Sequence, residues 1–481
     1  MSGRVRSALA ALVTVGVLAA LSSCGAGSPG KAKPSGAAGH MASVGADFNG
    51  DGYADLAVGA PYATVDGRNE AGYVAVMYGS AHGLSTAHRT IINRATPGTY
   101  GGPKIVSMFG AELAKGDLDG DGYADLVVGT MPNTGMVVAW GGRQGLSSPT
   151  ELPHPGTLSA VGDFNGDGHL DLVLFATAHS LDDGPSGTTE TVWYGPISRA
   201  AKPSVTSTLT TPSDSVYQVD KAVSGDVNGD GRADLAVVAG TSSGTTGFRT
   251  DLYLGSAAGL RRAPDRHVPQ GNDVALGDVN GDGCADVVTA GAKKQQVVIG
   301  YGSKDGVAPA SRWTTITRDT PGIPGRATDD FASDVAVGDV TGDGVDDIAV
   351  GATRKRVGKV ANSGAVLLLR GRHGGVTGSD AQEFTQDTPG VPGSAARHDY
   401  FGDYFGETVQ LLDVNGNGHA DLAVSASKNL AGDPSPRNSG EGTVWLLRGR
   451  PTGLTSDAAL AFGPRTIGAP SSGAHFGLSL G

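Results

Sequence analysis

Cysteine and basic residues are scarce in this sequence. Only two of its 481 residues are cysteine, and 36 are lysine or arginine against 48 that are aspartate or glutamate. A chain so poor in cations lacks the electrostatic footprint of nucleic-acid binding, so we expect no nucleic-acid partner. One of the cysteines, Cys24, falls in an N-terminal targeting segment. We therefore expect no intramolecular disulfide in the mature chain.

Glycine is abundant instead, with 78 residues, about twice the usual share. A nine-residue motif, first seen at Asp47–Asp55, occurs seven times. Oxygen-bearing side chains occupy its positions 1, 3, 5 and 9, glycine its positions 4 and 6, and apolar residues positions 2 and 10. The other copies start at Asp117, Asp163, Asp226, Asp278, Asp339 and Asp413.

Hard oxygens that alternate along a tight loop are what Ca²⁺ requires, since it takes six to eight oxygen ligands, one of them usually a backbone carbonyl. Glycine at position 6 allows the sharp turn. One copy alone would be read as a polar turn, but seven copies favour seven metal loops. The predicted ligands, at positions 1, 3, 5, 7 and 9, are Asp47, Asn49, Asp51, Tyr53, Asp55, Asp117, Asp119, Asp121, Tyr123, Asp125, Asp163, Asn165, Asp167, His169, Asp171, Asp226, Asn228, Asp230, Arg232, Asp234, Asp278, Asn280, Asp282, Cys284, Asp286, Asp339, Thr341, Asp343, Val345, Asp347, Asp413, Asn415, Asn417, His419 and Asp421. At position 7 we expect the carbonyl to bind and the side chain to vary freely.

The EF-hand and dockerin loops are the obvious alternatives, and both need an acid at position 12 followed by a helix. Position 12 is never acidic here; it is Val58 in the first loop and Val128 in the second. Short apolar runs follow instead, such as Leu56–Val58, and these predict buried strands. Each loop should therefore join two strands.

The N-terminal residues predict a targeting segment. Arg4 and Arg6 precede an apolar run from Ala8 to Leu21, and Leu21-Ser22-Ser23-Cys24 resembles the lipobox of bacterial lipoproteins. An ordinary signal peptide with a stray cysteine is the alternative. We expect residues 1–24 to be a lipoprotein signal ending in lipidated Cys24, 25–40 a flexible Gly/Ser/Pro linker, and 41–481 the folded domain. The resulting localisation is secreted and anchored to the outer face of the cell membrane.

The loop starts lie 46 to 74 residues apart, a long period made of strands and turns that favours a propeller. Each period can be divided into four strands. Strand 1 runs into the loop, as in Phe109–Ala114, and strand 2 leaves it. Strand 3 is, for example, Gly72–Tyr78, and strand 4 Arg89–Ile92.

Phe109-Gly110 before a loop, Asp-x-Asn-Gly-Asp-Gly within it and Val58–Pro61 after it resemble the FG-GAP repeats of integrin α-subunits and of bacterial FG-GAP proteins. The resemblance implies a seven-bladed, all-β propeller of four-stranded blades with Ca²⁺ in the hairpins of strands 1 and 2. Phe476–Leu480 has the pattern of strand 1 without a loop. We therefore expect this segment to complete the first blade and close the ring.

Antiparallel strands place the metal loops and the 3–4 turns on one face, called the metal face, and the 2–3 and 4–1 connections on the other, called the second face. The longest second-face connections are Pro61–Ala71, Ala178–Glu190, Thr353–Ser363 and Ser427–Glu441; the 4–1 set holds a near-duplicate at Asp319–Gly325 and Asp387–Gly393. Integrins bind partners on the face away from these Ca²⁺ sites, so the resemblance implies a partner on the second face.

We interpret the chain as a monomeric, non-enzymatic surface protein that binds an extracellular protein or glycan. An extracellular propeller hydrolase or lyase, and a purely structural envelope component, are the alternatives. Gly240–Gly244 matches a nucleophile pattern but runs into more loop residues rather than a helix, so its context is wrong. Lys115-Gly116-Asp117 resembles an integrin-ligand tripeptide, but Asp117 belongs to a metal loop. No catalytic residues are predicted.

Overall fold

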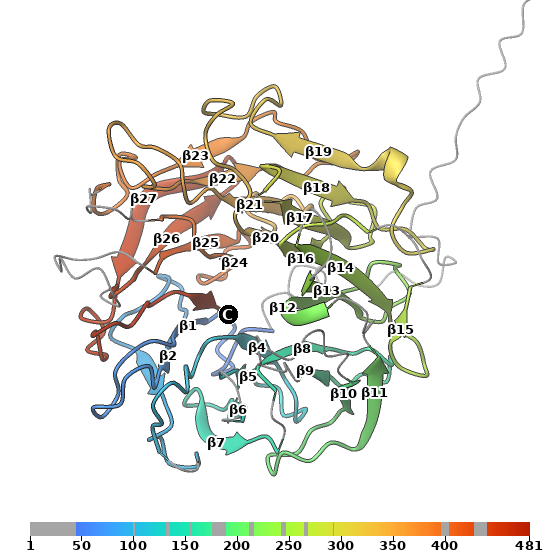
Figure 1. Ribbon diagram of the computed structural model, residues 1–481, viewed down its shortest axis with the longest axis vertical. Helices are drawn as coiled ribbons and strands as arrows, with labels where there is room; N and C mark the ends of the chain where they lie inside the picture. Colours follow the sequence, from blue (N-terminus) through green and yellow to red (C-terminus); the bar gives the residue numbers. More distant parts are fainter. Residues whose placement is uncertain are drawn as a thin grey trace, which may run out of the picture.

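The structure is a computed structural model that describes residues 45–99, 102–130, 135–153, 156–175, 189–210, 216–241, 247–263, 268–291, 293–395, 404–427 and 440–481. These residues form seven four-stranded antiparallel sheets, arranged as blades around one axis (Figure 1). The prediction of an all-β, seven-bladed propeller is confirmed. In the described ranges, no helix is long or apolar enough to cross a membrane.

Each blade runs from an inner strand at the axis to an outer strand at the rim (Figure 1). The only helix in the described residues is a 3-10 turn, η1 (Ala310–Arg312). In blade order the strands are β28 (Ser479–Leu480), β1 (Leu56–Ala60), β2 (Tyr73–Met77) and β3 (Arg89–Ile92); β4 (Leu113–Gly116), β5 (Asp125–Val128), β6 (Val137–Trp140) and β7 (Ser147–Glu151); β8 (Leu158–Gly162), β9 (Asp171–Phe175), β10 (Thr189–Tyr194) and β11 (Val205–Thr210); β12 (Val216–Gly225), β13 (Asp234–Thr241), β14 (Phe248–Leu254) and β15 (Arg261–Arg262); β16 (Asp273–Gly277), β17 (Asp286–Gly291), β18 (Gln296–Gly300) and β19 (Thr314–Thr317); β20 (Val335–Gly338), β21 (Asp347–Gly351), β22 (Val366–Leu369) and β23 (Gln382–Phe384); and β24 (Val409–Leu412), β25 (Asp421–Ala426), β26 (Thr443–Arg450) and β27 (Gly453–Phe462).

The hydrophobic core is divided into seven layers, one between each pair of neighbouring blades. Leu56 and Val58 of β1 face the layer between blades one and seven, whereas Ala57 faces the layer between blades one and two. Strand 2 is therefore buried on both faces. This explains why its sequence is a continuous apolar run instead of an alternating one. Each large side chain buried in this way contributes about 1.5–3 kcal/mol.

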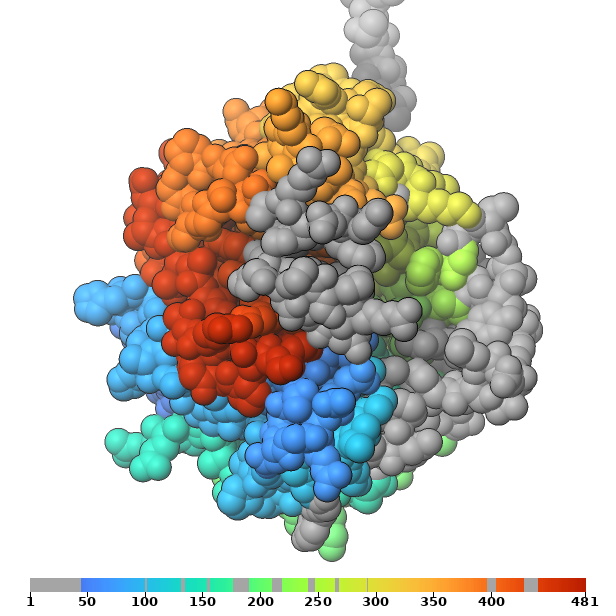
Figure 2. Space-filling view, turned by 60° about the vertical axis from the view of Figure 1, so that its left-hand side comes forward, coloured from blue at the N-terminus to red at the C-terminus, as the bar shows by residue number. Residues whose placement is uncertain are grey.

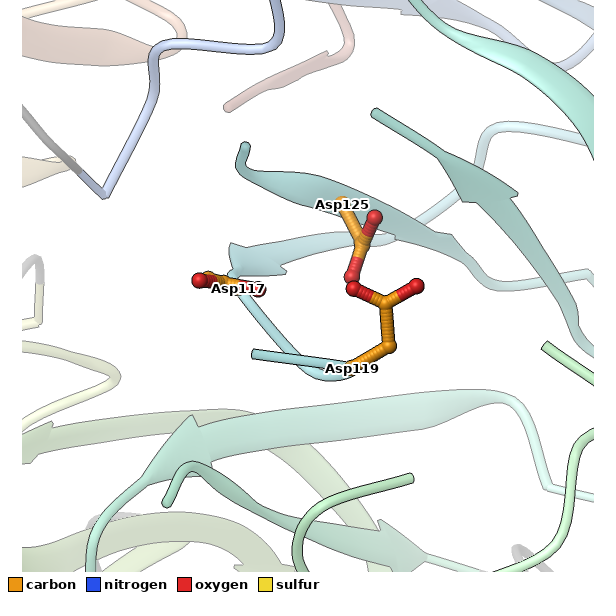
Figure 3. Close-up of side chains that lie close together, drawn as sticks. All are labelled: Asp117, Asp119 and Asp125. Atoms are coloured by element: carbon orange, nitrogen blue, oxygen red, sulfur yellow. The ribbon is translucent and has the colours of Figure 1, made fainter. Parts of the chain in front are cut away.

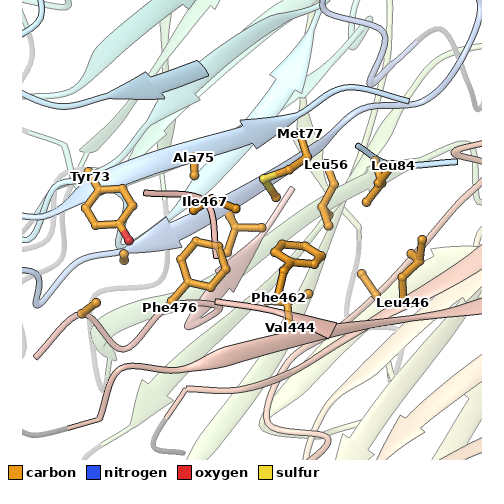
Figure 4. Packing of buried hydrophobic residues seen from close by; sticks show 14 of the residues in the cluster. Leu56, Tyr73, Ala75, Met77, Leu84, Val444, Leu446, Phe462, Ile467 and Phe476 are labelled. Carbon is orange, nitrogen blue, oxygen red and sulfur yellow. The ribbon is translucent and has the colours of Figure 1, made fainter. Parts of the chain in front are cut away.

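The C-terminal segment closes the ring, as predicted. β28 pairs antiparallel with β1, with Leu480 opposite Val58, and the C-terminal residues lie directly against the first blade (Figure 2). Phe476 is fully buried and meets Phe462 edge-on, with ring centroids 6.0 Å apart, in the layer shown in Figure 4. Residues 41–44, which could have shared this register, lie outside the described residues.

The Phe-Gly pairs do not lie within strand 1, which corrects the predicted strand Phe109–Ala114. β4 begins only at Leu113. Phe109 is fully buried, and its N–H donates to the carbonyl of Ala71 in the preceding blade, 3.2 Å away. Gly110 has φ +90°, and its N–H donates to Gly129 of its own blade at 3.1 Å. The pair therefore joins two blades. Phe109 supplies the buried side chain and the bond to the preceding blade, and Gly110 supplies the positive φ and the bond to its own blade.

Candidate functional site

All seven loops connect strand 1 to strand 2 of a blade, as predicted. Within each loop, the position-1 carboxylate organises the turn. In the second loop, Oδ1 of Asp117 accepts hydrogen bonds from Gly120 and Asp121 at 2.8 and 3.0 Å, and Oδ2 accepts one from Gly122 at 2.8 Å. The position-6 glycine makes this last bond in every loop, at 2.7–2.9 Å.

The position-9 aspartate has a second role that the sequence analysis missed. It is fully buried in all seven loops. Its Oδ1 accepts a 2.8–2.9 Å hydrogen bond from a glycine at or just after the end of strand 3, so it ties the loop to a third strand. Burial raises the pKa of Asp55 to about 8 and that of Asp125 to about 7, opposed by two backbone N–H donors in each case. A cation beside such a carboxylate would favour its charged form.

The donor sets fit a hard cation. In the second loop, carboxylate oxygens of Asp117, Asp119 and Asp125 all lie within 4.8 Å of one another (Figure 3). In the fifth and sixth loops, Asn280 Oδ1 and Thr341 Oγ1, both at position 3, are buried without a hydrogen-bond partner. A buried oxygen without a donor carries a desolvation cost, and a bound Ca²⁺ would remove it. The five predicted positions of each loop, including the position-7 carbonyl, would hold the ion and stiffen the hairpin.

An arginine from the neighbouring blade already binds the second loop. Arg199 follows β10 in blade three, where the Gly-x-x-x-Gly turn of the other six blades is missing. Its guanidinium contacts Asp119 Oδ2 at 2.6 Å and Asp121 Oδ2 at 2.5 Å and lies over the Trp140 ring. This cation partly neutralises the loop that is richest in carboxylates. The number of carboxylates therefore overstates the net negative charge at that loop.

The loops also join the blades into a belt. The position-8 N–H donates to the position-1 carbonyl of the preceding loop at six of the seven junctions, for example from Ala124 to Asp47 at 2.9 Å. The position-7 side chain packs on glycine 4 of that loop: a Cβ on Gly50 would lie 2.5 Å from the ring of Tyr123. The residue type at position 7 does vary, as expected, but its side chain also contributes to the blade junction.

Cys284, at position 7 of the fifth loop, is fully buried and disulfide-bonded. This contradicts the expectation of no intramolecular disulfide. The sequence holds one other cysteine, Cys24, which lies outside the described residues.

Charged residues line the axis, where the sequence analysis found no constellation. Lys221 Nζ lies 2.5 Å from Asp273 Oδ1 and 3.5 Å from Asp334 Oδ1, beside a cavity of about 320 Å³. Asp273 and Asp334 each accept a further hydrogen bond from the backbone of the next blade, at 2.8 and 2.7 Å. We call these three residues the axial cluster. Burial raises the pKa of Glu112, at the same level in blade two, to about 7, although Lys221 opposes this.

The axial residues share one position in their repeats. Glu112, Lys221, Asp273 and Asp334 all lie five positions before the first aspartate of a metal loop. Burial raises the pKa of Asp334 well above its usual value, reinforced by Asp273, whereas Lys221 holds the pKa of Asp273 low. The sequence alone does not show that these side chains contact one another, because they come from different blades.

Loss of the axial lysine should destabilise the fold. We expect Lys221→Met to lower the free energy of unfolding by about 3 kcal/mol, the lower end for a broken buried pair, because Lys221 is one-third exposed. Denaturant unfolding measures this. Adding Asp273→Asn and Asp334→Asn should restore most of the loss, and Lys304→Met at an exposed site should cost almost nothing. An unchanged stability in Lys221→Met would contradict a structural role for the cluster.

The second-face connections are more than solvated loops. In Pro61–Ala71, the residues Ala63, Val65 and Ala71 are buried. The near-duplicate 4–1 turns are bound to the next blade. Arg318, directly before the first turn, donates to the carbonyl of Pro324 in that turn at 2.6 Å and lies 2.7 Å from Glu383 Oε1 of the next blade. In the second turn, the carbonyl of Pro389 accepts a hydrogen bond from Ser456 Oγ at 2.7 Å. Most of Ala178–Glu190 and Ser427–Glu441 lies outside the described residues, as do residues 242–244 of the Gly-x-Ser-x-Gly pattern.

Comparison with known proteins agrees with this architecture. The FG-GAP repeat model matches residues 40–77, 331–369 and 405–447, and the FG-GAP-like repeat model matches 117–174 and 226–289, together half of the chain. Integrin alpha-PS5 of Drosophila melanogaster is 43% identical over 86 residues, 17% of this chain and 8% of that protein. Phosphatidylinositol-glycan-specific phospholipase D of Rattus norvegicus is 35% identical over 109 residues, 21% of this chain and 13% of that protein.

Among solved structures, a mutant of AofleA from Arthrobotrys oligospora aligns with a TM-score of 0.38 and 12% identity, over 71% of this chain and 88% of that one. A likeness at that TM-score is too weak to support an argument. The sequence matches span less than a sixth of the length of the two curated relatives above. What carries the assignment is the repeat itself, found by family models along the chain and seen seven times in the fold. The chain belongs to the family of FG-GAP repeat proteins.

Proposed function

We propose that this chain is a Ca²⁺-binding, lipid-anchored cell-surface propeller that binds an extracellular protein or glycan on its second face, without catalysis. The observation that carries the proposal is a difference between the two faces in what their residues contact and expose. Loop backbones and side chains on the metal face are occupied with joining blades. The second-face connections also bind neighbouring blades in places, but they are longer and present exposed side chains such as Arg68 and Lys359. Resemblance to integrin α-subunits supports a recognition or adhesion role.

The face prediction can be tested with paired surface variants. Arg68→Ala with Lys359→Ala alters exposed side chains of two 2–3 connections, and Arg143→Ala with Lys304→Ala alters exposed side chains of metal-face turns. Extracellular protein and glycan arrays probed with the wild type identify a partner. We expect its binding to weaken by about threefold to tenfold in the second-face pair only, with melting temperatures unchanged. Equal weakening by the metal-face pair would contradict the proposal.

The lipid anchor is tested by Cys24→Ala. We expect the wild type in the membrane fraction, with a lipid-modified N-terminal peptide in mass spectra, and the variant in the medium. A wild type found entirely in the medium, or a Cys24–Cys284 peptide in non-reducing digests, would contradict anchoring.

A hydrolase or lyase is the second candidate, and the axial cluster is the observation that favours it. Two carboxyl groups and an ammonium converge there beside a cavity. Every one of these groups, however, already has a partner within the cluster or in the adjacent backbone. Hydrolytic screening of Lys221→Met against the wild type separates the two: activity lost with the lysine would favour the enzyme.

A further inference from the structure

We propose that the second face carries a binding pocket for an acidic sugar, such as a uronic acid unit of a glycan. The pocket has a volume of about 440 Å³ and lies where blades four, five and six meet. Its lining includes Phe248, Gln270, Asn272, Lys293, Lys294 and Arg354. The inference rests on the proposed function and narrows the partner from protein or glycan to one chemical class.

The charge of the pocket is the reverse of the charge of the chain. The whole protein has a formal charge of −12, yet three of the described lining residues are basic and none is acidic. Two other second-face cations are neutralised: Arg318 and Lys355 both pair with Glu383. Lys294 and Arg354 are exposed, and their side chains have no carboxylate partner in the described structure. An anionic ligand would supply one.

The pocket also offers an apolar surface. Phe248 is 36% exposed and is the only aromatic among the exposed large hydrophobic residues of the described ranges. An exposed aromatic ring beside cations suits a ligand with an apolar ring face and a charged edge, which is the form of a uronic acid. The volume lies at the small end for ligand pockets, so it fits one or two sugar rings better than an extended acidic peptide.

Hydrogen bonds hold the described backbone around the pocket. The Gln270 side chain is fixed by hydrogen bonds to the backbone of Thr250 and Val268. Lys294 N–H closes a turn on Gly291 at 2.9 Å, and Arg354 N–H donates to Asp330 at 2.8 Å. Binding would therefore order only a few side chains, which limits its entropic cost.

The test is calorimetric titration of the full chain, in Ca²⁺-saturated buffer, with digalacturonate and with its neutral counterpart galactobiose. We expect the acidic sugar to bind about tenfold or more tightly than the neutral one, and more weakly as salt rises. Arg354→Gln and Phe248→Ala should each weaken it by about tenfold and leave the melting temperature unchanged. The control Lys304→Gln, on the metal face, should bind like the wild type.

Equal binding of both sugars, or unchanged affinity in both pocket variants, would overturn the inference. A hexaglutamate peptide that binds more tightly than the sugar, with the same loss in Arg354→Gln, would overturn it in favour of an acidic protein partner. If an array partner depends on Arg68 and Lys359 but not on Arg354 or Phe248, the proposed function stands and the pocket inference fails. If no partner binds the second face at all, both fail.

Discussion

Removal of Ca²⁺ is expected to lower the melting temperature by about 10 °C or more. Each filled site adds about 2.7 kcal/mol when Ca²⁺ is a hundredfold above Kd, and several sites act together on a single ring. The loops pack carboxylates closely, as in Asp117, Asp119 and Asp125, and without metal their repulsion opposes the hairpin. Because the same loops form the belt between blades, this repulsion would act on every junction.

The measurement is a melting curve in excess Ca²⁺ and in chelator, with bound ions counted by mass spectrometry. Mg²⁺ should restore little stability, because it demands a small octahedral shell. An unchanged melting temperature, or fewer than about four bound ions at millimolar Ca²⁺, would contradict the expectation of multiple Ca²⁺ sites.

The seven sites should differ in affinity. We expect the seventh loop to be the weakest, because only Asp413 and Asp421 are charged and Arg448 Nη1 lies 3.2 Å from Asp421 Oδ2. The sixth, with Thr341 at position 3, should also be poor. The second loop should be the strongest by charge, and Arg199→Gln should strengthen it further by removing a competing cation. Weaker binding in that variant would mean that the guanidinium supports the ion-bound form.

Opening the ring at its closure should have the second large effect. We expect Phe476→Ala to cost about 3–5 kcal/mol, the range for deleting a buried phenylalanine, because the ring is fully buried between Tyr73 and Phe462. Removal of 476–481 should be more severe. It also deletes the β28–β1 pairing and the reciprocal hydrogen bonds of Ala57 and Gly481, both 2.9 Å.

Denaturant unfolding of Phe476→Ala measures the first effect, and Phe248→Ala is its matched control at an exposed position. The truncated chain should aggregate, because β1 would then present an open strand edge. A monomeric truncated protein with a wild-type melting curve would show that the ring does not need the C-terminal strand.

The sequence by itself determined the elements that repeat locally. Seven loops with oxygen at fixed positions, apolar runs such as Leu56–Val58 and a loopless strand pattern at Phe476–Leu480 were enough to predict seven blades and their closure. These patterns can be read from the sequence alone because each depends on a few adjacent residues. A turn needs its glycine, and a strand buried on both faces needs its apolar run.

Only the tertiary structure decided what joins one blade to the next. Phe109, Tyr123 and Arg199 act on residues of a neighbouring blade, tens of residues away in the chain, and no local spacing encodes which neighbour each side chain meets. The axial cluster and the cationic pocket arise in the same way, each from three blades. Their members are single residues in otherwise ordinary strands and turns, and their chemistry appears only when ring closure brings them within a few ångströms of one another.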